Sequence, residues 1–261
     1  MSLSDLLNKY ERVVYERVPL VEVIVQIRFP PILSLQEKQL AELQGQLIDD
    51  FPVSKILEGL QFALAGPSVQ PPQQSRSYAF SNPKTAETVM VSANSLTLTT
   101  NKYTRWEEFL PKFLRVLDQF KAIYKLRAWN RIGLRYRDVI DPIILGIEDP
   151  NWAELVTPAV AGMLASGLIE DPKSLVAASS AHWAHGDVKV ILQTSVVENG
   201  STGQKSFLID YDFSNEGEFV DDWSDMASRI ENLHKFAGPL FRWSISESLH
   251  NALKPQTLRA N

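Results

Sequence analysis

A strand with a two-residue hydrophobic period is the first strong pattern along the chain. Apolar side chains occupy alternate positions of the segment 21–29, namely Val21, Val23, Val25, Ile27 and Phe29. Glu22, Gln26 and Arg28 lie at polar positions between them. Because successive side chains of a strand point to opposite faces of its sheet, this alternation predicts a half-buried strand with one polar face.

A second strand is predicted over residues 131–141. Its apolar positions are Ile132, Leu134, Tyr136 and Val139. Since Val139 falls out of step with the other three, we expect a slip in the alternation near the end of this strand. Arg131, Arg135 and Arg137 then share the opposite, polar face.

Three further strands and two helices are predicted in the first half of the chain. The strands are expected near 55–66, 76–81 and 87–100. Ser34 and Glu37 have the spacing of a capping box, which satisfies backbone N–H groups at a helix start, and they predict a helix after the first strand. Thr104 and Glu107 predict a second such start, and Pro111 is expected to bend that helix or delay its start.

The second half repeats this order of element types. After the strand over 131–141, the patterns predict a helix, three strands and an aromatic-rich helix near Trp223, with the first helix at 151–169 and the strands near 174–183, 188–197 and 205–213. Each half therefore reads β-α-β-β-β-α, which predicts an internal duplication. The alternative is that an α+β chain of this size can be cut into two similar halves by chance.

Two tandem β-α-β-β-β-α units predict an α+β protein with an antiparallel sheet and helices packed on one face. We expect a first lobe over 14–127 and a second over 128–255, or one continuous domain that contains both.

The composition is that of a folded globular protein. Of 261 residues, 44% are hydrophobic and 22% charged, so extensive disorder is not expected. The absence of cysteine excludes a disulfide scaffold, a Cys-ligated metal site and a cysteine nucleophile. No signal-like or bilayer-length apolar run is present, and we expect a cytoplasmic protein with no membrane partner. The net charge of −5 argues against a protein whose main task is to coat nucleic acid.

No sequence motif of a known catalytic mechanism is present. The nucleophile elbow, the phosphate-binding loop, the dinucleotide fingerprint and the HExxH zinc motif are all missing, so neither an enzyme nor a cofactor is expected. His182 and His185 are predicted at a strand end, where their spacing does not suit a metal. Asp210 and Asp212 share a strand face, and they are interpreted as solvated carboxylates or, alternatively, as cation ligands.

The most suggestive chemistry is the arginine face of the second strand. If the two predicted strands are neighbours, their polar faces form a basic groove suited to a carboxylate or phosphate, since arginine binds such anions bidentately. Gly133 would leave room for a close approach. The candidate binding residues are Arg28, Gln26, Arg131, Arg135 and Arg137.

Two other interpretations of this face stay open. Glu22, Asp138 and Asp141 can neutralise the arginines as cross-strand ion pairs. Alternatively, the groove binds nucleic acid, with nearby aromatic residues stacking on unpaired bases.

Both strands resemble the signature segments of a sporadically distributed prokaryotic family. The similarity lies in Pro19–Phe29, which reads PLVEVIVQIRF, and in Arg131–Asp138, which reads RIGLRYRD. Members of that family are about as long as this chain and have no established biochemical activity. Their patchy occurrence implies mobile or accessory genes, including phage-defence systems. The resemblance supplies no catalytic residues.

These observations favour a non-catalytic interaction or assembly protein that binds a protein partner or itself. The alternative is a nucleic-acid or anion binder that uses the arginine-lined sheet face. An enzyme with an unrecognised site is a third interpretation.

Overall fold

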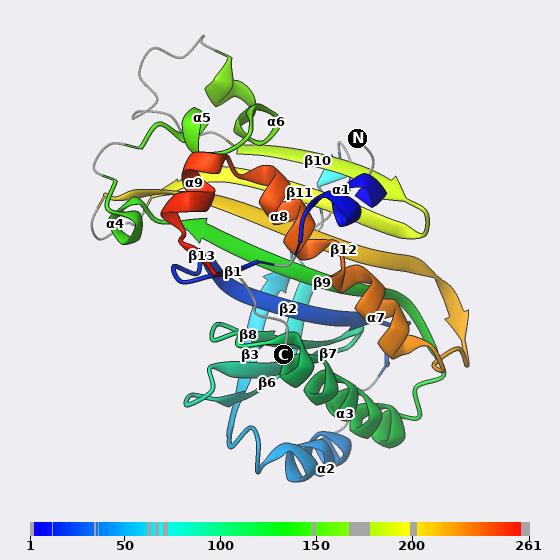
Figure 1. Ribbon diagram of the computed structural model, residues 1–261. Helices are drawn as coiled ribbons and strands as arrows, with labels where there is room; N and C mark the ends of the chain where they lie inside the picture. Colours follow the sequence, from blue (N-terminus) through cyan, green and yellow to red (C-terminus); the bar gives the residue numbers. More distant parts are fainter. Residues whose placement is uncertain are drawn as a thin grey trace. The chain divides into compact units, whose positions relative to one another are not determined.

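The computed structural model describes most of the chain (Figure 1). The described residues are 3–11, 13–33, 35, 37–61, 64–65, 68–69, 73–147, 150–166, 178–198 and 203–256. The helix cap expected at Ser34, the end of the helix predicted over 151–169 and parts of the strands predicted near 55–66 and 174–183 lie outside them.

The first half of the chain contains three helices and eight strands among the described residues. The helices are α1 (Leu3–Lys9), α2 (Glu37–Leu47) and α3 (Trp106–Tyr124). The strands are β1 (Val14–Tyr15), β2 (Leu20–Arg28), β3 (Val53–Gln61), β4 (Leu64–Ala65), β5 (Ser68–Val69), β6 (Gln73–Asn82), β7 (Glu87–Ser92) and β8 (Ser95–Thr100).

The second half is built differently in its connecting segments. Its strands are β9 (Ala128–Ile140), β10 (Ala178–His185), β11 (Val188–Glu198), β12 (Lys205–Val220) and β13 (Pro255–Gln256). Its helices are α4 (Pro142–Leu145), α5 (Trp152–Leu155), α6 (Pro158–Ala161), the 3₁₀ turn η1 (Gly162–Ala165), α7 (Met226–His234), α8 (Ala237–Ser244) and α9 (Glu247–Ala252).

A large sheet confirms the α+β class. Among the described residues, nine strands form it in the order β10-β11-β12-β9-β2-β8-β7-β6-β3. The pairs β10–β11, β11–β12, β7–β8, β6–β7 and β3–β6 are antiparallel. The two strands predicted first, β2 and β9, are neighbours in this order.

The contacts divide the chain into two compact units. Unit 1 contains Met1–Val23, Leu134–Asn215 and Ser228–Asn261, and unit 2 contains Ile24–Gly133 and Glu216–Ala227. Each unit is therefore assembled from separate stretches of chain, whereas the expected lobes are continuous in sequence, and those lobes stay a prediction.

The observed order of helices and strands differs from the predicted β-α-β-β-β-α repeat. Between α2 and α3 the chain forms more strands than the three predicted, and several one-turn helices stand where one helix was expected over 151–169. The internal duplication therefore stays a prediction.

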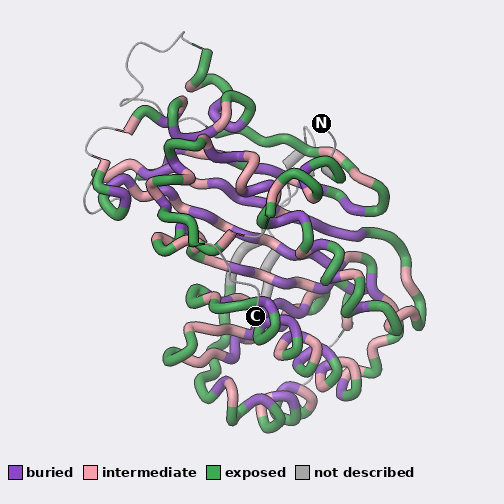
Figure 2. The backbone as a smooth tube through the Cα atoms, in the orientation of Figure 1, coloured by how far each residue is buried: buried purple, intermediate pink, exposed green. Residues whose placement is uncertain are grey.

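The core of unit 1 follows from the alternation in β12. Phe207, Ile209, Tyr211 and Phe213 are all buried, and alternating burial recurs along the strands in Figure 2. Phe213 stacks on Phe236, just before α8, with ring centroids 6.3 Å apart. At Phe213, the apolar face of β12 thus packs against the residue that precedes α8.

The core of unit 2 is organised by α3. Its buried stripe is Trp106, Phe109, Leu110, Phe113, Val116, Leu117, Phe120 and Ile123, at the spacing of one helix face. Phe29, at the end of β2, lies 5.4 Å from Phe120 between ring centroids. The strand and helix predicted from their apolar periods therefore bury those faces against each other.

The start of α3 corrects one sequence expectation. The helix begins at Trp106 with Arg105 as its N-cap residue, and no side chain caps it. Thr104 instead donates a hydrogen bond of 2.7 Å from Oγ1 to Glu108 Oε2. The start lies one residue later than the capping box requires, and the helix runs on through Pro111.

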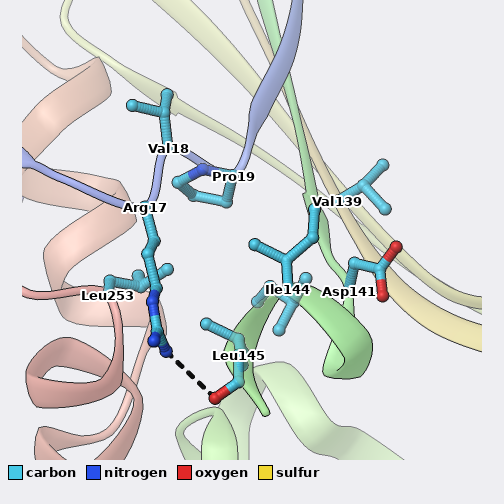
Figure 3. A pocket seen from close by; sticks show the side chains of 9 residues that line it. Arg17, Val18, Pro19, Val139, Asp141, Ile144, Leu145 and Leu253 are labelled. Carbon is cyan, nitrogen blue, oxygen red and sulfur yellow. Dashed lines mark hydrogen bonds between the residues drawn. The ribbon is translucent and has the colours of Figure 1, made fainter.

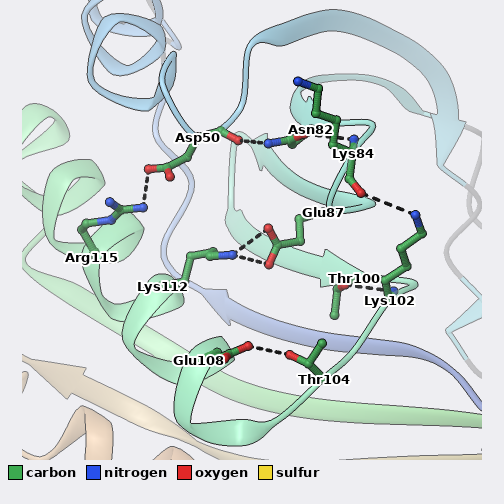
Figure 4. Close-up of polar contacts among 10 residues, drawn as sticks. All are labelled: Asp50, Asn82, Lys84, Glu87, Thr100, Lys102, Thr104, Glu108, Lys112 and Arg115. Carbon is green, nitrogen blue, oxygen red and sulfur yellow. Dashed lines mark hydrogen bonds and ion pairs between the residues drawn. The ribbon is translucent and has the colours of Figure 1, made fainter.

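Charged side chains tie α3 to the rest of unit 2 (Figure 4). Lys112 donates to both carboxylate oxygens of Glu87 on β7, at 2.5 and 2.7 Å. Arg115 bonds to Asp50, whose backbone oxygen also accepts a 2.8 Å hydrogen bond from Asn82. These ion pairs join helix, loop and strand within the unit, so their charges have a structural role.

Candidate functional site

The arginine strand is extended, as predicted. β9 runs from Ala128 to Ile140 with Ile132, Leu134 and Tyr136 buried. The expected slip at Val139 is wrong, because the alternation continues unbroken to the buried Ile140. Asp138 is therefore placed on the apolar face rather than beside the arginines.

In unit 1, Arg135 forms a bidentate ion pair with Asp210. Its Nε donates to Asp210 Oδ1 at 2.7 Å and its Nη2 to Asp210 Oδ2 at 2.5 Å. The Asp210 side chain is only 5% exposed. The hydrogen bonds that Arg135 donates to Asp210 also raise the pKa of Arg135 above its ordinary value.

Arg137 completes this network. Its Nη1 donates to Glu22 Oε2 at 2.8 Å, and its Nε lies 3.5 Å from Asp210 Oδ2. The cross-strand pair with Glu22 was anticipated, but the partners expected at Asp138 and Asp141 are replaced by Asp210. Asp210 is accordingly neither a solvated carboxylate nor a cation ligand, because two guanidinium groups occupy it.

In unit 2, the guanidinium group of Arg131 lies against the backbone of Gly133, which has no side chain. Its Nε is 3.4 Å from Glu216 Oε1. A β-carbon added to Gly133 would lie 2.2 Å from Arg131 Nη1, so the missing side chain is what lets the guanidinium lie there. The space predicted at Gly133 is thus filled by Arg131 itself.

Arg28 is oriented by a chain of polar contacts in unit 2. Its Nε donates to Gln26 Oε1 at 2.8 Å, and Gln26 Nε2 donates to Thr97 Oγ1 at 3.0 Å. Gln26 therefore uses both ends of its amide, one against β8 and one against the arginine.

The candidates thus fall into two groups. Arg135 and Arg137 belong to unit 1, where carboxylates engage them, and Arg28, Gln26 and Arg131 belong to unit 2.

A polar pocket of about 340 Å³ lies in unit 2. It is lined by Arg28, Phe29, Asn94, Asn130, Arg131 and Glu216. The backbone N–H of Phe29 donates to the Asn94 carbonyl at 3.1 Å, which brings the β7–β8 turn against the end of β2. The sequence identified the two arginines but not Asn94, Asn130 or Glu216, since they meet through strand order rather than through a motif.

A second hollow, in unit 1, is too small for a ligand. It encloses about 10 Å³ between Pro19, Val139, Leu145 and their neighbours (Figure 3). Arg17 donates from Nη1 to the Leu145 carbonyl at 3.0 Å across this hollow. A cavity of this volume holds at most one water molecule.

β10 is a long, uncharged edge strand. It lies at one end of the sheet order, and within the described chain it pairs only with β11. Its sequence is ASSAHWAH, and six of its eight residues are exposed (Figure 2). His182 accepts or donates a 2.8 Å hydrogen bond with Ser180, and His185 meets the ring of Phe236 edge-on. The sequence predicted a strand here but could not show that it is an edge.

Asp138 is a carboxyl group inside the apolar core of unit 1. Burial, and secondarily the negative charge of Asp210, raise its pKa to about 8. Burial likewise raises the pKa of Tyr15 to about 12, and it raises that of Tyr211 well above the ordinary tyrosine value. Asp138 lines neither of the two pockets described above, so its burial gives no access to a substrate there.

No described helix is long and apolar enough to cross a membrane. Among the described residues there is also no cluster of three or more histidine, aspartate or glutamate side chains that could hold a metal ion.

No protein-family model, curated protein or solved structure matches this chain. The resemblance to the sporadically distributed prokaryotic family therefore stays a prediction based on the two strand motifs.

Proposed function

We propose that this chain is a non-catalytic assembly protein that self-associates by antiparallel pairing of β10 with β10 of a second copy. The observation that carries the proposal is the exposed edge of β10. An edge strand presents alternate backbone N–H and C=O groups that have no ladder partner on that side, which makes it a template for another strand.

β10 lacks the features that usually protect an edge. Such strands are commonly short, charged, interrupted by proline or bent by a bulge. β10 has eight residues, no charged residue and no proline. Its register with β11 is continuous from Ala178 opposite Ser195 to His185 opposite Val188, so no bulge bends it. The opposite edge, β3, carries Lys55 and Glu58.

A second copy is the partner that this sequence fits. In an antiparallel pair related by a twofold axis normal to the sheet, residues that face each other must lie on the same sheet face. An axis at Ala181 places Ala178 opposite Ala184 of the partner subunit, and Ser180 opposite His182 of the partner subunit. Small or uncharged side chains meet at every position, so no like charges repel.

The charged groups of unit 1 support a structural role for its sheet face. Arg135 and Arg137 are held by Asp210 and Glu22, which leaves the strongest charges of this face engaged with one another. Recognition through backbone pairing at β10 requires none of them.

Sedimentation velocity over a range of concentrations tests the proposal. The wild-type chain is expected to show a monomer–dimer equilibrium. Ala181→Lys places two ammonium groups opposite each other at the axis and should weaken the dimer about fivefold, the effect of a directly opposed like-charge pair.

Gln193→Lys is the matched control. Gln193 is also an exposed strand residue, but it lies on β11, one strand in from the edge, and adds the same charge. It should leave the dimer unchanged. A wild-type chain that stays monomeric at every concentration, or equal weakening by both variants, would contradict pairing through β10.

A further inference from the structure

His182 is the ionisable side chain closest to the axis of the β10 pair proposed above. It is exposed, and it directly follows Ala181, through which that axis passes. The paired segment 178–184 reads ASSAHWA, so its other side chains carry no charge at any ordinary pH. The net charge of the paired segment therefore depends on His182 alone.

Ser180 orients the imidazole ring of His182. The Ser180 Oγ and His182 Nε2 atoms lie 2.8 Å apart, and residues two apart along a strand share one face of the sheet. Ala178 and Ala184, on the same face of β10, are also exposed. Small side chains therefore flank the ring on its own strand, and they leave room for the side chains of a second copy.

The neighbouring strands place few charges beside His182. On β11 the residue opposite His182 is Ile191, and Lys189 is the charged residue next to it on that face. On β12, Asp212 lies opposite Ile191, and Asp210 is engaged by the arginines of β9. Of these residue types only histidine ordinarily changes its charge between about pH 5 and about pH 8. The other charges are the same in a monomer and in a pair, so they do not make association depend on pH.

The symmetry of the pair brings two copies of His182 close together. With the axis at Ala181, His182 faces Ser180 of the partner subunit, and the two His182 side chains are diagonal neighbours on one sheet face. Diagonal neighbours in an antiparallel pair lie roughly 7–8 Å apart, within reach of long and aromatic side chains. Because both copies titrate over the same range, the pair acquires two neighbouring positive charges as the pH falls.

We propose that protonation of His182 controls the β10 pairing, so that the neutral ring permits the dimer and the imidazolium favours the monomer. This control rests on the proposed assembly function and adds its regulation. Two separate monomers carry their protons without mutual repulsion, whereas the dimer holds the two charges side by side. The dimer therefore binds protons less strongly than the monomers, and association weakens as the pH falls from about 8 to about 5.

His185 is also on β10 but has a different position. It is the last residue of the strand, lies outside the paired segment 178–184 and is on the opposite sheet face from His182. Its Nε2 lies 2.9 Å from Ser4 Oγ, and its ring meets Phe236 edge-on. Protonation of His185 therefore brings no two charges together at the axis.

Sedimentation velocity at about pH 8 and about pH 5.5 tests the control by His182, at constant ionic strength and over a range of protein concentrations. The dissociation constant of the wild-type dimer should be about threefold higher at the acidic pH, the effect of one pair of neighbouring like charges. His182→Gln keeps a neutral hydrogen-bonding side chain and should dimerise equally well at both pH values. His182→Lys is charged throughout and should dimerise weakly at both.

His185→Gln is the matched control, because it makes the same substitution on the same strand away from the axis. It should keep the pH dependence of the wild type. A circular dichroism spectrum like that of the wild type, recorded for each variant at both pH values, separates dissociation from unfolding.

The assembly function and its control by His182 fail in different ways. A wild-type chain that is monomeric at both pH values contradicts the assembly function, and the control by His182 with it. A dimer with the same dissociation constant at both pH values, or a pH dependence that survives in His182→Gln, contradicts the control by His182 but leaves the pairing intact.

Discussion

Arg135 and Asp210 form a bidentate ion pair between β9 and β12, with nitrogen–oxygen distances of 2.7 and 2.5 Å. Asp210 is nearly inaccessible to solvent, whereas 39% of the Arg135 side chain is exposed. The arginine therefore supplies the charge and the donors that a buried carboxylate needs.

Arg135→Met should lower the free energy of unfolding by about 2 kcal/mol, because it removes two hydrogen bonds from a buried carboxylate. Arg137, whose Nε lies 3.5 Å from Asp210, limits the loss. Urea unfolding followed by circular dichroism measures it. Arg105→Gln, which breaks an exposed pair with Glu108, should leave the free energy of unfolding nearly unchanged, because solvent screens such pairs. Equal losses in the two variants would show that the Arg135–Asp210 pair contributes no more to the free energy of unfolding than an exposed ion pair.

The buried carboxyl group of Asp138 should make the free energy of unfolding fall as the pH rises. The unfolded chain releases this proton near pH 3.8, whereas the folded chain holds it until about pH 8. Between these values the unfolded state binds fewer protons, so stability is greatest below about pH 4 for this group and declines up to about pH 8. The total decline is on the order of a few kcal/mol.

Asp138→Asn should flatten this decline, since an amide does not ionise. The decline is measured as the urea midpoint of unfolding of the wild type and the variant at a series of pH values between about 4 and about 8. Parallel curves for the two proteins would mean that Asp138 is ionised in the folded chain.

Gly133→Ala should lower the stability of the chain only through Arg131. The added β-carbon would lie 2.2 Å from Arg131 Nη1, so the guanidinium has to leave its place on the strand. In a double-mutant cycle followed by urea unfolding, the alanine should lower the free energy of unfolding in the wild type but cause a smaller loss in Arg131→Gln. Additive losses would place the effect of Gly133 elsewhere.

Two substitutions of Trp129 should destabilise unit 2 to different extents. Its Nε1 donates to the Asp222 carbonyl at 2.7 Å, and its ring stacks on Phe219 with centroids 3.8 Å apart. Trp129→Phe loses the hydrogen bond but keeps an aromatic ring, and should cost about 1 kcal/mol. Trp129→Leu also loses the stack and should cost about 1 kcal/mol more, as measured by thermal unfolding. A leucine variant as stable as the phenylalanine variant would show that the stack contributes nothing.

The periodicity of the sequence was sufficient to predict β2, β9 and the amphipathic α3. Each of these elements buries a face that local spacing reveals, such as the stripe of α3 that contains Phe113. The unbroken alternation of β9 also placed Asp138 on the core face, but assigning Val139 to the core concealed this.

The partners of the arginines could not be predicted in the same way. Asp210 lies 75 residues from Arg135, and the two meet because β12 neighbours β9. Strand order and register are long-range properties that no local window contains. The edge position of β10 was hidden for the same reason, since its sequence predicts a strand whether or not a neighbour covers it.

The contrast between β10 and the charged strand β3 also bears on stoichiometry. Joining unlike ends of a sheet is a head-to-tail contact, which leaves a new end free at each step and can extend into a fibre. Joining two β10 ends uses both uncharged edges at once and leaves only strands that carry Lys55 and Glu58 outermost. Growth would then stop after the first encounter, which limits the product to a closed pair.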